Sequence, residues 1–140
     1  MSNSSDPNIP ALEPLPVTKT IMTVDDSPSM RMLLRAALTD LGYLVVEAED
    51  GVHALETLSN FEPDEEPDLL ITDINMPRMD GFGLIENVRA EGRRTLPILV
   101  LTTESSDEKK QRARNAGATG WIVKPFHPDK LAAAIRRVLH

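Results

Sequence analysis

The sequence predicts an α/β fold in which five parallel strands form one doubly wound sheet covered by helices. Short apolar runs of strand length recur along the chain, and stretches with helical periodicity separate them. Most of these runs are continuously apolar, which is typical of strands buried on both faces. The runs are Ile21–Val24, Leu44–Val46, Leu69–Ile71, Ile98–Leu101 and Trp121–Val123.

The clearest helical stretch begins after Ser27 and ends at Gly42. Ser27 is a favourable N-cap, Pro28 suits the first helical position, and glycine is typical of a helix end. Strands that alternate with helices form right-handed crossovers, which predicts a flavodoxin-like fold with five helices and strand order 2-1-3-4-5. The periodicity places six apolar residues on one face of this helix: Met30, Leu33, Leu34, Ala37, Leu38 and Leu41.

One domain accounts for most of the chain. Its 140 residues, of which 41% are hydrophobic, suffice for one core and are too few for two. Residues 1–18 carry four prolines among polar residues, so we expect a flexible N-terminal tail. The domain then spans residues 19–140. Because the last predicted helix, 127–139, reaches the end of the chain, we expect no output domain.

Composition and charge argue against several classes of function. The chain has no cysteine, and its three histidines are scattered, so thiol chemistry is excluded and a zinc site is disfavoured. A net charge of -7 disfavours binding to nucleic acid. There is no signal-peptide pattern and no run of about 20 apolar residues. We therefore expect a cytoplasmic protein with neither nucleic acid nor membrane as a partner.

Polar residues follow four of the predicted strands at their carboxyl ends. Asp25 and Asp26 follow the first strand, Asp73 the third, Thr102 the fourth and Lys124 the fifth. Each alone could simply cap a helix or end a strand, but in open parallel sheets these ends form a common ligand-binding edge. Three carboxylates in one pocket repel each other unless a cation neutralises them. Oxygen ligands without imidazole or thiolate favour Mg²⁺.

The same residues belong to motifs that occur in a characteristic order. Over about residues 19–139 the chain resembles the receiver domains of two-component response regulators, and especially the single-domain regulators of bacterial chemotaxis. Such a receiver is a signalling phosphoprotein that catalyses only its own phosphorylation and dephosphorylation, so the resemblance argues against an enzyme with other substrates. The motifs are Val24–Ser27, Asp73–Pro77, Met79–Gly81, Thr102 and Lys124–Phe126.

The resemblance implies a chemical role for each residue at the predicted site. Asp73 would be the nucleophile that accepts a phosphoryl group from a phosphohistidine kinase. Asp25, Asp26, Asp73 and the backbone carbonyl of Asn75 would hold Mg²⁺. Lys124 and Thr102 would each contact a phosphoryl oxygen.

The resemblance also implies how the signal is timed and transmitted. Asn75 and Glu104 flank the path of the hydrolytic water and would tune the lifetime of the acyl phosphate. Thr102 would move toward the phosphoryl group, and Trp121 would turn into the space that it leaves.

A surface that includes several basic side chains is the predicted docking site for partners. The implied partners are a histidine kinase of the CheA type, a flagellar motor switch protein or another phospho-dependent target, and a phosphatase. Two outputs stay open: control of the flagellar motor, or service as a phosphate sink or phosphorelay intermediate. The surface comprises Lys109, Lys110, Arg114, Trp121 and Lys130.

Rival classes fit the sequence less well. An aspartyl hydrolase of the haloacid dehalogenase type carries a second carboxylate two residues after its nucleophile, where this chain has Asn75. A flavin carrier on the same fold needs a phosphate-binding loop after the first strand, where Asp25 and Asp26 would repel phosphate. A receiver cut from a longer transcription factor is disfavoured because the last predicted helix reaches the end of the chain, so no output domain is expected.

Overall fold

Five parallel strands form the centre of the computed structural model, which describes residues 18–139. They pair in the predicted order, with the second strand at one edge of the sheet and the fifth at the other. Of the predicted tail, residues 1–17 lie outside the described part of the chain. The strands are β1 (Thr20–Val24), β2 (Leu44–Ala48), β3 (Leu69–Thr72), β4 (Ile98–Thr102) and β5 (Gly120–Val123).

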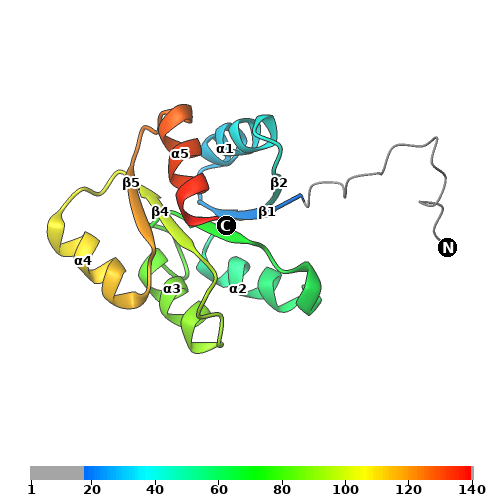
Figure 1. Cartoon of the computed structure of the whole chain (residues 1–140). Helices are drawn as coiled ribbons and strands as arrows, with labels where there is room; N and C mark the ends of the chain where they lie inside the picture. The colour runs from blue at the N-terminus through cyan, green and yellow to red at the C-terminus, as the bar shows by residue number, and fades with distance from the viewer. Residues whose placement is uncertain (1–17, 140) are drawn as a thin grey trace, which may run out of the picture.

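Helices connect the strands and cover both faces of the sheet. The α-helices are α1 (Pro28–Asp40), α2 (Gly51–Ser59), α3 (Gly81–Ala90), α4 (Asp107–Ala116) and α5 (Pro128–Val138). In Figure 1, α1 and α5 lie above the sheet, and α2, α3 and α4 lie below it. A short 3-10 helix, Pro63–Glu65, interrupts the loop after α2, residues 60–67, which contains four carboxylates and is called the acidic loop.

The sheet separates two hydrophobic cores. Adjacent residues of one strand point to opposite faces, so Ile21 packs with α1 and α5, whereas Met22 packs with α2, α3 and α4. Both side chains are fully buried. This explains why the central strands are apolar at consecutive positions. Among residues 18–139, no helix combines the length and the apolar character needed to cross a bilayer.

Helix α1 begins and ends as predicted, but it buries a narrower stripe. The Ser27 hydroxyl accepts a hydrogen bond from the Met30 amide, and Gly42 has a φ of 94° just after the helix. Of the six apolar residues on the predicted face, Leu34 and Leu38 are buried. Leu33 and Leu41 belong to the same apolar set, but they are 57% and 43% exposed. Successive helical residues are rotated by about 100°, and only the stripe nearest the sheet is covered.

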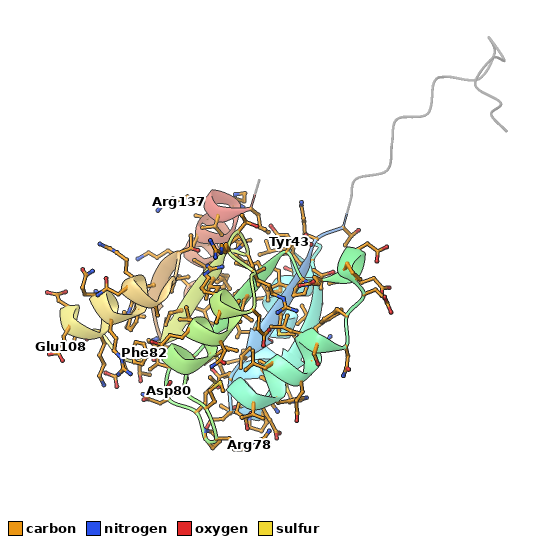
Figure 2. The ribbon with its side chains drawn as sticks, turned by 90° about the horizontal axis from the view of Figure 1, so that it is seen from below. Tyr43, Arg78, Asp80, Phe82, Glu108 and Arg137 are labelled. Carbon is orange, nitrogen blue, oxygen red and sulfur yellow. The ribbon has the colours of Figure 1, made fainter. Side chains whose placement is uncertain are left out.

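Helix α4 is attached to its neighbours largely by polar contacts. Ala113 is its one buried residue among those described. The Arg112 guanidinium lies over the Phe82 ring of α3, 4.0 Å from the ring centroid. Arg89 of α3 donates to the carbonyl oxygen of Gly117, which ends α4, with a nitrogen–oxygen distance of 2.7 Å. Figure 2 shows Phe82 on α3 and Glu108 at the far end of α4.

Candidate functional site

The carboxyl ends of the strands bring the predicted charged residues to one edge of the sheet. Asp25 directly follows β1 and Asp73 directly follows β3, and these two strands are neighbours in the sheet. Lys124 follows β5 and reaches both carboxylates. Its Nζ atom lies 2.8 Å from Asp25 Oδ2 and 2.8 Å from Asp73 Oδ2. Residues from three separate strand ends therefore form one hydrogen-bonded cluster.

Three carboxylates gather around this cluster. Oxygens of Asp25, Asp26 and Asp73 all lie within 4.8 Å of one another. Asp25 is 2% exposed and Asp73 is 9% exposed, whereas Asp26 is open to solvent. One ammonium cannot neutralise three carboxylates, so the site retains an excess of negative charge. The donor set, made of hard carboxylate oxygens with one accessible ligand, fits a partly hydrated Mg²⁺ ion.

Backbone amides fix the two buried carboxylates in orientation. Asp25 Oδ1 accepts from the Ser27 amide at 2.9 Å, and Asp73 Oδ1 accepts from the Ile74 amide at 2.6 Å. In both residues the other oxygen faces Lys124. Arg31, which the sequence did not single out, donates to the backbone carbonyl of Asp25 at 2.6 Å and braces the same turn. The acidic side chains are thus preorganised rather than freely rotating.

The two carboxylates keep Lys124 charged. Burial by itself lowers the pKa of the Lys124 ammonium, but hydrogen bonds to Asp25 and Asp73 and the attraction of both charges outweigh burial, so this pKa is raised above its ordinary value. A raised lysine pKa stabilises the folded state fully below the ordinary lysine pKa, and this stabilisation is lost only as the pH rises through the raised value. The ion pairs therefore persist throughout the neutral range.

Thr102 lies at the end of β4 and is fully buried. Its hydroxyl oxygen accepts a long hydrogen bond, 3.4 Å, from the Glu104 amide. Its backbone carbonyl accepts from the Lys124 amide at 2.7 Å, which ties the two strand ends together. Thr102 therefore occupies the predicted edge of the sheet beside the charged cluster, without a hydrogen bond to its carboxylates.

Glu104 connects three parts of the structure that flank the cluster. Its Oε1 atom accepts from Asn75 Nδ2 at 3.2 Å and from Lys109 Nζ at 2.9 Å. Its backbone carbonyl accepts from the Trp121 indole nitrogen at 3.1 Å. Hydrogen bonds from Lys109 and then from Asn75 hold the pKa of the Glu104 carboxyl below its ordinary value. The predicted pair Asn75 and Glu104 is thus in direct contact, and Lys109 of α4 joins it.

The position of Lys109 beside Glu104 was not predicted from the sequence, where Lys109 was expected only on the partner surface. The spacing offered a weak signal, because Lys109 lies five residues after Glu104 and in the first turn of α4. The acceptor of the Trp121 N–H was not predicted either. A half-buried indole needs such an acceptor, but the sequence does not specify which carbonyl lies within reach.

Trp121 lines a hollow beside α4. The hollow has a volume of about 90 Å³, and Lys110 and Arg114 are among its lining residues. Lys109 and Lys130, the other predicted members of the partner surface, lie on α4 and α5. These helices cover opposite faces of the sheet, so the predicted surface wraps around edge strand β5.

Replacing Trp121 by phenylalanine tests the indole hydrogen bond. Phenylalanine keeps an aromatic ring but lacks the indole N–H that donates to Glu104, so we expect loss of this hydrogen bond to lower the free energy of unfolding by about 1 kcal/mol. Urea unfolding followed by circular dichroism measures the change. Ile122→Val, next to it in β5, is a control for the loss of packing alone. An unchanged free energy in the Trp121 variant would show that the indole bond contributes nothing to stability.

Comparison with known families agrees with this geometry. The family model described as "Response regulator receiver domain" matches residues 21–136. The solved structure of the chemotaxis protein CheY4 of Vibrio cholerae superposes with a TM-score of 0.81 and 43% sequence identity, covering 88% of this chain and 100% of that one.

Curated relatives include both short and long proteins. The chain is 41% identical to the chemotaxis protein CheY1 of Helicobacter pylori strain J99 over 121 residues, which cover 85% of this chain and 95% of CheY1. It is 38% identical to the probable transcriptional regulator ycf27 of Guillardia theta over 125 residues, which cover 89% of this chain and 47% of that protein. Similar sequences therefore occur both as nearly the whole of a protein and as part of a longer one.

Proposed function

The chain belongs to the response regulator receiver domain family, and from this premise we propose that it accepts a phosphoryl group from a phosphohistidine kinase onto Asp73. The observation that carries this proposal is the contact of Lys124 with both Asp25 and Asp73 inside a cluster of three carboxylates. Transfer of a phosphoryl group requires an oriented nucleophile, ligands for a metal ion and a fixed positive charge, all at the acceptor site. The cluster offers all of these.

In the proposed reaction a carboxylate oxygen of Asp73 attacks phosphorus. The bond between phosphorus and the donor's imidazole nitrogen breaks, its electron pair stays on that nitrogen, and an acyl phosphate forms on Asp73. Asp25, Asp26, Asp73 and the backbone carbonyl of Asn75 would hold Mg²⁺, which supplies positive charge to the phosphoryl oxygens. Beyond its 2.8 Å contact with Asp73, the Lys124 ammonium can donate to one of those oxygens.

Phosphorylation of Asp73 would change the contacts of Thr102 and of the residues around Glu104. The Thr102 hydroxyl would donate to another phosphoryl oxygen, which draws the end of β4 toward the site. That end is linked to Glu104, and Glu104 is linked to Asn75, Lys109 and Trp121. We propose that Asn75 and Glu104 set the lifetime of the acyl phosphate and that Trp121 reports its presence to the surface of α4 and β5.

The proposed biological role is a cytoplasmic signal in bacterial chemotaxis. Relatives named as chemotaxis proteins support it, because the chain covers nearly their whole length. The chain would then act as a signalling phosphoprotein and not as an enzyme on other substrates. Its partners would be a kinase of the CheA type, a flagellar motor switch protein and a phosphatase.

A phosphate sink or phosphorelay intermediate is the second candidate. The observation that favours it is the existing hydrogen bond between the Trp121 indole and the Glu104 carbonyl. This hydrogen bond restricts the rotation of the Trp121 side chain, so the side chain can move less when Asp73 is phosphorylated. A phosphate sink only has to accept and release the phosphoryl group, and its surface does not have to change.

Incubation with Mg²⁺ and acetyl phosphate tests the acceptor function. We expect one phosphoryl group per chain, measured by intact-protein mass spectrometry, and peptide mapping should place it on Asp73. Chelation of Mg²⁺ should prevent the addition. Phosphorylation at another residue, or at the same rate without metal, would contradict the proposal.

Binding to a purified flagellar motor switch protein, with and without beryllofluoride as a phosphoryl mimic, separates the two outputs. Tighter binding in the presence of the mimic supports motor control. Equal and weak binding in both states, together with rapid phosphoryl transfer from the kinase, supports the sink.

A further inference from the structure

A buried carboxylate outside the acidic cluster holds the loop between β3 and α3. Asp50 precedes α2 and is only 2% exposed. Arg78 donates to both of its oxygens, from Nε to Oδ2 at 2.8 Å and from Nη2 to Oδ1 at 3.1 Å. Such two-pronged pairs fix orientation as well as distance. The hydrogen bonds from Arg78 also hold the pKa of the Asp50 carboxyl below its ordinary value.

Arg78 has an unusual backbone conformation at this contact. Its φ is 64°, a region that residues other than glycine seldom adopt. The Met79 amide donates to the Pro77 carbonyl at 2.6 Å, so Arg78 is the central residue of a γ-turn. Figure 2 shows Arg78 at the tip of this loop and Asp80 where the loop returns to α3. A strained turn persists when its surroundings hold it, and the side-chain pair with Asp50 does so here.

Backbone contacts hold the loop at its tip and at its base. At the tip, the Gly51 amide donates to the Met79 carbonyl at 3.2 Å, and a Cβ atom on Gly51 would lie 2.7 Å from Met79 Cγ. At the base, the Gly81 amide donates to the Ile74 carbonyl at 2.8 Å. Asn75, whose backbone carbonyl is one of the proposed Mg²⁺ ligands, lies between these two attachments.

We propose that Asp50 and Arg78 are positioning residues that preorganise this loop for Mg²⁺. The inference rests on the proposed function, because it concerns the metal used in phosphoryl transfer. A ligand that is already held in place loses less conformational freedom on binding. Groups that support metal ligands from behind typically change metal affinity about tenfold or more when they are removed. Arg78 acts through the loop and need not touch the ion.

Arg78→Gln is the first test, with Arg94→Gln in the α3–β4 loop as the matched control. In the metal-free protein, the Gly51 amide should exchange its hydrogen faster in the Arg78 variant, as measured by NMR. Isothermal titration calorimetry should show Mg²⁺ affinity reduced about tenfold, in line with other supporting residues. The control should match the wild-type protein in both measurements, and its free energy of unfolding confirms an intact fold.

Two more variants separate the ion pair from the backbone turn. Arg78→Gly relieves the positive φ but removes the pair, so it should bind Mg²⁺ as weakly as Arg78→Gln. Asp50→Asn retains an acceptor for the cap of α2, in which Asp50 Oδ1 accepts from the His53 amide at 2.9 Å, and it should show the same loss. Wild-type affinity in Arg78→Gly or Asp50→Asn would overturn the role of the pair. Unchanged exchange at Gly51 in Arg78→Gln would overturn the attachment itself.

The outcome for the wild-type protein keeps this inference distinct from the proposed function. A wild-type chain that binds no Mg²⁺ would overturn the proposed function and, with it, the role of the pair toward the metal. A wild-type chain that binds Mg²⁺, with variants of equal affinity, would overturn only the positioning role.

Discussion

Asp73→Asn is expected to abolish phosphoryl acceptance completely. The amide lacks the negative charge and the nucleophilicity of the carboxylate, so no acyl phosphate can form at this position. Intact-protein mass spectrometry after incubation with Mg²⁺ and acetyl phosphate should show the unmodified mass. The fluorescence of Trp121, the one tryptophan of the chain, should remain constant during the incubation.

Asp64→Asn in the acidic loop provides the matched control, because Asp64 is exposed and lies in the short 3-10 helix after α2. It removes the same charge without touching the cluster, and it should be phosphorylated like the wild-type protein. A phosphorylated Asp73→Asn variant would show that another side chain is the acceptor.

Lys124→Met is expected to produce the largest loss of stability at the site. The Lys124 side chain is 11% exposed and contacts Asp25 and Asp73, and its removal leaves two buried carboxylates next to each other. Breaking a buried ion pair in this way costs about 3 kcal/mol or more. Urea unfolding in the presence of a chelator measures this loss. Saturating Mg²⁺ should reduce it, because the ion neutralises the same carboxylates.

The same variant should still accept phosphate slowly, since Asp73 and the metal ligands are intact, but the response of Trp121 fluorescence should be small. Lys130→Met on the exposed face of α5 is the control and should change neither stability nor response. A metal-free Lys124 variant as stable as the wild-type protein would show that the carboxylates do not depend on the ammonium.

The order of the strands and the edge that carries the site were predictable because each depends on a regular pattern. Apolar runs predicted the strands, and the rule for parallel sheets brought Asp25, Asp73, Thr102 and Lys124 to one edge. The N-cap at Ser27 was equally predictable, since it is a local property of a few residues. The exposure of Leu33 was not, because it depends on how wide a stripe of α1 the sheet covers.

The contacts that link the site to its surroundings could not be predicted, because they join residues that are close only in the folded chain. Asp50 and Arg78 lie 28 positions apart, and neither belongs to a sequence pattern that predicts a contact with the other. The resemblance predicted only that Asn75 and Glu104 both lie near the site, not that they contact each other. Their hydrogen bond, and its extension to Lys109, required the three-dimensional arrangement.

Helix α4 contributes only two alanines to the core, the buried Ala113 and the partly buried Ala116. It is otherwise attached through Arg112, Arg89 and the pair of Lys109 with Glu104. Its solvent-facing positions are therefore under little constraint from packing. Substitutions there can change which partner is recognised while the sheet and the acidic cluster fold as before. A surface of this kind allows copies of one scaffold to acquire separate partners while the same acidic site is preserved.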